Sequence, residues 1–162
     1  MNKSVFKVII LLSIFLGIVS GVLTIVPYVG EIVFWLLITI SAPIVMIFLM
    51  LHNFLEIVDV RQSVVIGSLI GFVSFLTFSA VYIPSVILLA KYIHYSSNYG
   101  VSLLLSHSTF GLIVMLAIFM GILSATINSF SGFVTYYIVE FKKSLNNNNQ
   151  QNFKDEQFYD RK

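Results

Sequence analysis

Four long stretches without a charged residue dominate this sequence. Residues 8–26, 32–51, 64–89 and 110–139 contain no Asp, Glu, Lys or Arg. The hydrocarbon core of a bilayer is about 30 Å thick, and a helix needs roughly 20 apolar residues to cross it. Each stretch is therefore long enough for one crossing and too short for two. Because lipid offers the backbone no hydrogen-bond partners, each crossing is expected to be a helix.

The composition favours the same class of protein. Only 10% of the residues are charged and 58% are hydrophobic, whereas about a quarter of the residues in an ordinary soluble domain are charged. The sequence thus predicts an all-α, polytopic membrane protein with four transmembrane helices in an antiparallel bundle. We expect one transmembrane domain, residues 1–143. A cytoplasmic tail, residues 144–162, is expected to be disordered because it is polar and offers little to bury.

The first stretch also resembles a signal peptide, because Lys3 and Lys7 precede it. Two features argue against cleavage. The apolar run continues to Val26, which is longer than a usual signal core, and no small-residue cleavage site precedes a plausible mature start. We therefore expect an uncleaved first helix.

Basic residues beside the spans predict their orientation, since short cytoplasmic loops carry an excess of Lys and Arg. With the N-terminus inside, Lys91 is the basic residue beside the spans on the outer side. The basic residues on the inner side are then Lys3, Lys7, Arg61, Lys142 and Lys143. Both termini are thus predicted to be cytoplasmic. The abundance of Ile, Asn, Lys and Tyr is typical of an AT-rich genome, so the expected location is a bacterial plasma membrane.

The links and the proline residues suggest how the helices are joined. The short link 27–31 makes the first two helices antiparallel neighbours. The longer link 90–109 contains an apolar piece, 101–105, that is expected to dip into the interface. Pro43 and Pro84 lie inside spans and should kink them. A bend in the last span is expected at a group of small residues, Ser129, Ser131 and Gly132.

Small residues at four-residue spacing favour close packing of helices in lipid, where apolar burial alone does not drive association. Three spans contain such pairs: Gly17 and Gly21, Gly67 and Gly71, and Gly121 and Ala125. Asn128, with its side-chain amide, lies beside the third pair. One pair is a weak signal, whereas three favour a compact bundle, a tight oligomer, or both. A buried amide such as Asn128 typically contributes about 1 kcal/mol or less to helix association. It is more often a packing contact than a substrate contact.

A possible polar site lies on the outer side, formed by Glu31, His94 and His107. Glu31 begins the second span, where a carboxylate complements the helix dipole. That capping role is more common than handling a proton. The two histidines flank the outer link and have the chemistry to sense acidic pH or bind a cation, although most surface imidazoles do neither.

A weak metal-binding pattern lies on the inner side. His52, Glu56 and Asp59 fall at i, i+4 and i+7, so one helix face would present all three. A solvated helix end is the commoner meaning of this pattern, so we expect no metal and no cofactor. The chain has no Cys, which excludes disulfides and thiolate sites.

The function that these patterns favour is not catalytic. The sequence contains no P-loop, HExxH, GxSxG or Rossmann pattern, and its few basic residues form no nucleic-acid face. We expect an interaction, assembly or accessory component that works in the lipid bilayer with a second copy or another membrane protein. The alternative is a small oligomeric transporter or channel for a neutral or apolar solute. Transport usually needs polar groups at mid-depth, and those present are Thr39, Ser41, Ser74, Thr77 and Asn128.

Overall fold

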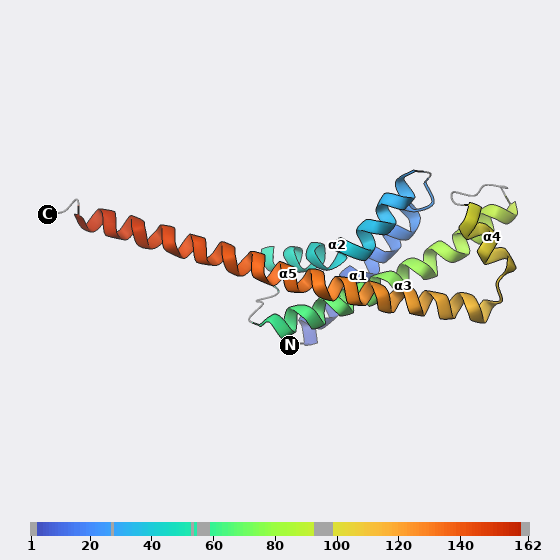
Figure 1. The fold of residues 1–162 in the computed structure, drawn as a ribbon, viewed down its shortest axis with the longest axis horizontal. Helices are drawn as coiled ribbons and strands as arrows, with labels where there is room; N and C mark the ends of the chain where they lie inside the picture. Colours follow the sequence, from blue (N-terminus) through green and yellow to red (C-terminus); the bar gives the residue numbers. More distant parts are fainter. Residues whose placement is uncertain (1–2, 27, 53, 55–58, 93–98, 160–162) are drawn as a thin grey trace.

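The computed structural model describes residues 3–26, 28–52, 54, 59–92 and 99–159, which form five helices (Figure 1). In chain order they are α1 (Lys3–Leu23), α2 (Val29–Leu51), α3 (Val60–Tyr92), α4 (Tyr99–His107) and α5 (Phe110–Tyr159). No strand occurs within these described ranges.

Four helices are long and apolar enough to cross a membrane: α1, α2, α3 and the part of α5 from Phe110 to Leu145. α2, α3 and α5 each contain one of the uncharged stretches, and α1 contains the first stretch up to Leu23. The prediction of a helical chain with four candidate spans is therefore confirmed. α3 extends beyond its uncharged stretch at both ends and includes Arg61 and Lys91. α4 has 9 residues, which is too few for a crossing.

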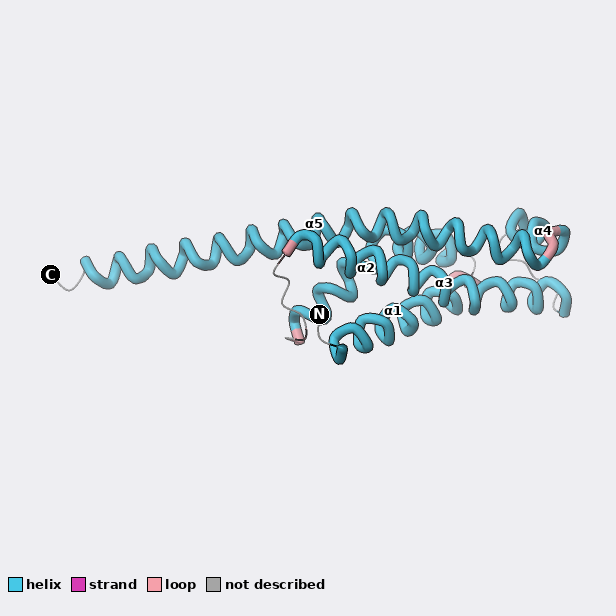
Figure 2. The backbone as a smooth tube through the Cα atoms, turned by 90° about the horizontal axis from the view of Figure 1, so that it is seen from below, coloured by secondary structure: helices cyan, strands magenta, loops and turns pink. Residues whose placement is uncertain are grey.

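The helix α3 is central to the molecule, because it contacts each of the other helices. α1 lies along one side of it (Figures 1 and 2). The positions that face each other are Gly17 and Ser74, then Gly21 and Val81. Since both numbers rise together, α1 and α3 run in the same direction.

The helix α5 lies along another side of α3 and runs in the opposite direction. Gly71 of α3 faces Ser124, whereas Ser63, two turns earlier in α3, faces Gly132. α5 continues as one helix past Ser129, Ser131 and Gly132, and the bend expected there stays a prediction. A Cβ at Gly132 would lie 2.6 Å from the carbonyl oxygen of Ser63, so this glycine serves close packing.

Two apolar clusters fill the space between α1, α2 and α3. The larger one lies toward the start of α1 and consists of Ile9, Ala42, Val45, Met46, Leu49, Ile66 and Ile70. The other is rich in aromatic rings and consists of Leu37, Ile38, Phe75 and Phe78. Each cluster therefore joins α2 to α3, but with different side chains.

The short helix α4 packs back onto the molecule. Leu105 of α4, Val86 of α3 and Ile113 of α5 form a third apolar cluster. We call this end of the molecule, where α3 finishes and α5 begins, the α4 end (Figure 1). The opposite end, where α1 and α3 begin, is called the N-terminal end. The apolar piece 101–105 thus lies within a helix that covers α3.

The helix α5 projects far beyond the other helices at the N-terminal end (Figures 1 and 2). It continues to Tyr159 and so includes most of the tail, 144–162, which we expected to be disordered. The sequence from Ser144 to Asn152 has no apolar face that could pack on another helix. Because an isolated helix gains little stability in water, disorder of this tail in solution stays a prediction.

Candidate functional site

The side-chain amide of Asn128, on α5, is fully buried and bonds to α2. Its Oδ1 accepts from the Ala42 backbone N–H at 2.8 Å and from the Ser41 hydroxyl at 2.7 Å. Its Nδ2 donates to the carbonyl oxygens of Ile38 at 2.7 Å and Ser124 at 3.0 Å. An amide offers two acceptor sites and two N–H donors. All four are used, so this group has no spare capacity for a ligand.

This amide bonds to two backbone groups of α2 that are one helical turn apart. In a regular α-helix the Ala42 N–H would donate to the Ile38 carbonyl. Here both groups bond to Asn128. If Oδ1 and Nδ2 exchanged places, the Nδ2 group would face the Ala42 N–H, and two donors cannot bond to each other. The hydrogen bonds therefore fix the orientation of the amide.

A second backbone group of α2, the carbonyl of Thr39, also receives a hydrogen bond from α5. Pro43 has no N–H, so the carbonyl of Thr39 lacks its usual helical donor. The Ser131 hydroxyl donates to that carbonyl at 2.7 Å. α2 changes direction about halfway along its length (Figure 1). The bent region of α2 is thus held by hydrogen bonds from Asn128 and Ser131.

Glycines allow the backbones to come close enough for these bonds. A Cβ at Gly71 would lie 2.6 Å from the Ser124 carbonyl oxygen, and one at Gly67 would clash with the Asn128 carbonyl oxygen. The Ser124 hydroxyl also donates to the Gly71 carbonyl at 3.1 Å. Nearer the N-terminal end, the buried Ser63 hydroxyl has no partner within the described residues.

The other small-residue positions differ in how tightly they pack. A Cβ at Gly17 would clash with the Ser74 carbonyl oxygen. At Gly121 it would lie 3.4 Å from the Phe72 ring, which is an ordinary contact. Ala125 is half-buried. On α5 the tight face runs through Ser124, Asn128 and Gly132, which is offset from the expected pair Gly121 and Ala125. The tight pairs pack within one chain, so an oligomer needs another face.

The expected outer polar site is described only in part. Glu31 lies in the first turn of α2 and is exposed. His107 ends α4, and its Nδ1 lies 3.0 Å from the Leu103 carbonyl oxygen. His94 lies outside the described residues, so the proposed grouping of the three stays a prediction.

The weak metal candidates are likewise partly described. His52 is exposed, its Nδ1 lies 2.9 Å from the Phe48 carbonyl oxygen, and its ring lies 4.3 Å from that of Phe48. Asp59 is exposed just before α3, and Glu56 lies outside the described residues. Within the described ranges, no group of three His, Cys, Asp or Glu residues is placed to hold a metal ion.

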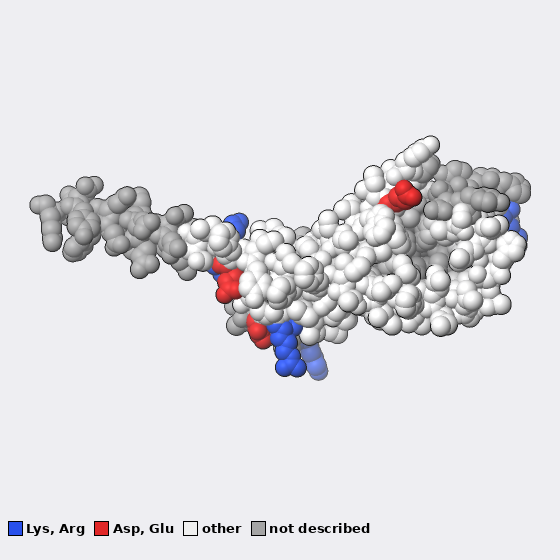
Figure 3. Space-filling view, in the orientation of Figure 1, with Lys and Arg blue, Asp and Glu red and all other residues white. Residues whose placement is uncertain are grey.

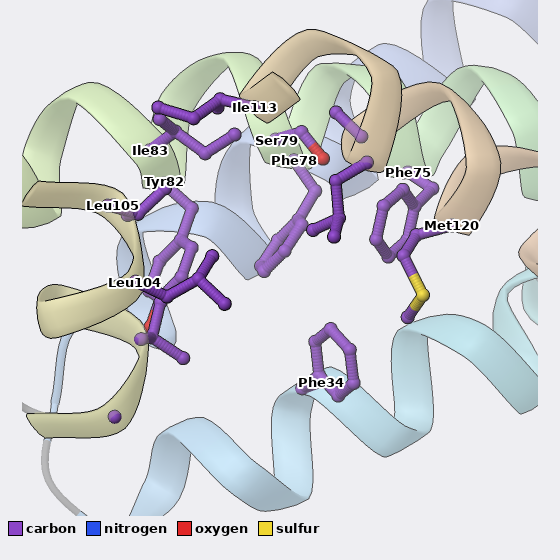
Figure 4. Close-up of a pocket in the computed structure, with 14 residues that line it drawn as sticks. Phe34, Phe75, Phe78, Ser79, Tyr82, Ile83, Leu104, Leu105, Ile113 and Met120 are labelled. Carbon is purple, nitrogen blue, oxygen red and sulfur yellow. The ribbon is translucent and has the colours of Figure 1, made fainter. Parts of the chain in front are cut away.

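A cavity of about 440 Å³ lies near the α4 end, between α2, α3, α4 and α5 (Figure 4). Its walls include the rings of Phe34, Phe75 and Phe78 and the side chains of Leu104 and Met120. Among the residues that the structure describes, no charged side chain lines it. Its size falls within the range of small-molecule sites, which are mostly apolar. Chemically, this cavity suits an uncharged, apolar group.

Comparison with known protein families, curated proteins and solved structures finds no match. The two structural features that bear on function are the polar cluster around Asn128 and the apolar cavity.

The sequence contains signals for residues of both features that were not recognised in these roles. Ser124 was not singled out, and Ser131 was singled out only for a bend, although they lie one turn before and after Asn128. Pro43, which was expected to kink its span, also leaves a carbonyl that needs an outside hydroxyl donor. For the cavity, Phe75, Phe78 and Tyr82 repeat at helical spacing and lie on one face of α3. In a membrane span such a repeat is easily taken for a lipid-facing surface.

Proposed function

We propose that this protein crosses a bacterial plasma membrane four times as an antiparallel bundle, with both termini in the cytoplasm. We propose further that it acts as an interaction, assembly or accessory component and catalyses no reaction. Its partners are the lipid bilayer and either a second copy or another membrane protein.

The observation that carries the proposal is that all donors and acceptors of the Asn128 side-chain amide are used within the protein. A transport path or a catalytic centre at mid-depth needs polar groups free to contact a solute or water. Asn128, Ser41 and Ser124 are all fully buried, and each makes at least one hydrogen bond to another helix. This polar cluster therefore supports a role in holding the bundle together.

The surface supports placement in a membrane. On the face shown in Figure 3, Lys, Arg, Asp and Glu lie near the ends of the helices, and a broad uncharged surface lies between them. Large side chains on α5 such as Phe119, Ile122 and Phe130 are exposed. In water such a surface would drive aggregation, whereas lipid or a membrane partner would cover it.

Single cysteines test the topology on this Cys-free background. His107→Cys at the α4 end should react with a membrane-impermeant maleimide in intact cells, whereas Ser144→Cys should react only after lysis. Both residues are exposed, so accessibility in the protein is matched. The reversed pattern would contradict the proposed orientation.

The second candidate is a transporter for a neutral or apolar solute, which the apolar cavity favours. If a water-filled path passes the centre, cysteines at Asn128 and Thr77 should react quickly with a water-soluble thiol reagent, because the reactive thiolate forms in water. We expect neither to react, while Ser144→Cys reacts after lysis. Rapid labelling at both positions, slowed by a solute, would replace our proposal with transport.

A further inference from the structure

We infer that the cavity at the α4 end holds one acyl chain of an anionic membrane phospholipid. The inference rests on the proposed membrane placement, because it takes lipid as the surrounding medium. It goes beyond that proposal by naming a specific binding site and the chemistry of its ligand.

The walls favour a flexible apolar chain. Aromatic rings from two helices, with aliphatic side chains from α4 and α5, line the space (Figure 4). Of the described residues in the lining, Ser79 and Tyr82 have polar side chains and none is charged. An empty space among such side chains would leave them without dispersion contacts. In a bilayer the most abundant group that restores these contacts is a lipid chain.

Part of the cavity lies along α3 at a depth that acyl chains reach. The lining residues of α3 run from Phe75 to Ile83, and Lys91 lies in the last turn of the same helix. At about 1.5 Å per residue, the cavity lies roughly 12 to 24 Å below Lys91 along the helix axis. Half of a hydrocarbon core is about 15 Å thick, so a chain whose headgroup lies at the level of Lys91 reaches the nearer part of the cavity, around Tyr82 and Ile83.

Charge favours an anionic headgroup. Lys91 is exposed at the α4 end, and its Nζ lies 5.8 Å from the centre of the Tyr92 ring. The other Lys and Arg residues that the structure describes belong to the start of α1, the start of α3 and the far part of α5. Glu31, in the first turn of α2, is an exposed carboxylate three residues before the cavity-lining Phe34, so an anionic headgroup must lie on the Lys91 side of the cavity. There a phosphate finds its cationic partner in Lys91. The site thus pairs a charged contact at the surface with an apolar chain below it.

Adjacent positions on α2 provide a matched pair of fluorescent reporters. Trp35 is the only tryptophan of the chain and is 63% exposed, whereas Phe34 lines the cavity. The native protein therefore reports on the outer surface. The double variant Phe34→Trp, Trp35→Phe reports on the cavity.

The experiment titrates both proteins, in detergent micelles, with phosphatidylglycerol that carries bromine on its acyl chains, because bromine quenches tryptophan on contact. We expect the cavity tryptophan to be half-quenched at a lipid mole fraction at least five-fold below that needed for Trp35. Unbrominated phosphatidylglycerol should restore its fluorescence. An identical dependence for the two tryptophans would overturn the proposal. Quenching of the cavity reporter by a brominated fatty acid, but not by the phospholipid, would overturn the identity of the ligand.

Filling the cavity provides the second test. Ala117 lines the cavity from α5, whereas Ala80 of α3 is exposed and is not among its lining residues. In the cavity-reporter background, Ala117→Phe should abolish quenching at low lipid content, and the control Ala80→Phe should leave it unchanged. If Ala117→Phe fails to fold, Ser79→Leu takes its place. A filled variant that is folded and still quenched at low lipid content would overturn the site.

The two proposals fail in different ways. In liposomes made entirely of brominated lipid, native Trp35 should be strongly quenched if the chain spans the bilayer. Absence of that quenching would contradict the membrane placement itself. Quenching of Trp35 without the selective quenching of the cavity reporter would leave the membrane placement intact and reject the lipid site.

Discussion

The two halves of the contact between α3 and α5 are built in opposite ways. In the half toward the N-terminal end, Gly67 and Gly71 let the α3 backbone touch that of α5 at Ser124 and Asn128. In the half toward the α4 end, large side chains such as Phe75 separate the helices, and a cavity remains between them. In the proposed membrane setting lipid is as apolar as these side chains, so hydrophobicity would not distinguish the halves. The size of the side chains does.

Hydrogen bonds follow the same division. The amide of Asn128 reaches the α2 backbone only because the glycines of α3 bring α5 close. In a medium of low dielectric constant its four hydrogen bonds are strong, and an unpaired group would be costly. The packed half thus gains specificity from polar bonds, whereas the open half has apolar walls and room for a ligand.

The largest effect is expected from a bulky side chain in the packed half. Gly71→Leu should lower the free energy of unfolding by more than about 3 kcal/mol, because its Cβ alone meets the Ser124 carbonyl oxygen at 2.6 Å. Unfolding in mixed detergent micelles measures it. Leu88→Ala, at a position that is 54% exposed, is the control and should change little. Equal effects of the two would show that this face of α3 is not an interface.

A smaller effect is expected when the central amide is removed. Asn128→Ala should lower the free energy of unfolding by about 1 to 2 kcal/mol, the range for buried hydrogen bonds in proteins and membranes. The cost stays moderate because Ala42 and Ile38 can restore a regular helical bond. Thr126→Ala is a suitable control, since that hydroxyl bonds only to its own helix, at the Ile122 carbonyl. A cost for Asn128→Ala no greater than that of the control would contradict the role of the amide.

How far the sequence predicted these features depends on the range of the interaction. The four spans follow from local composition, and the importance of Gly71 and Asn128 follows from residue type. On the tight face of α5, Asn128 was predicted as a packing residue but Ser124 was not, because Ser124 and Ala125 are both small and only the rotation of the helix separates them. The cavity could not be predicted, since it depends on the bend of α2 and on α4 folding back against α3.

The proline and its hydroxyl partner provide a double-mutant test of the packed half. Ser131→Ala should lower the free energy of unfolding by about 1 kcal/mol, because it leaves the Thr39 carbonyl without a donor. In a Pro43→Ala background residue 43 regains its N–H, which can donate to Thr39, so the same change should cost close to nothing. The difference between the two costs measures the coupling. Equal costs in both backgrounds would mean that Ser131 does not compensate for the proline.

The smallest effect, of opposite sign, is expected where the packed half gives way to the open half. A Cβ at Gly121 would lie 3.4 Å from the Phe72 ring and 3.5 Å from the Leu76 side chain, both ordinary contacts. Gly121→Ala should therefore stabilise the protein by about 0.5 kcal/mol, because alanine loses less backbone entropy than glycine in a helix. Gly71→Ala, the matched change in the packed half, should destabilise it. If Gly121→Ala destabilises the protein as much as Gly71→Ala does, α3 and α5 are in close contact along their whole length, and the contrast between the two halves is wrong.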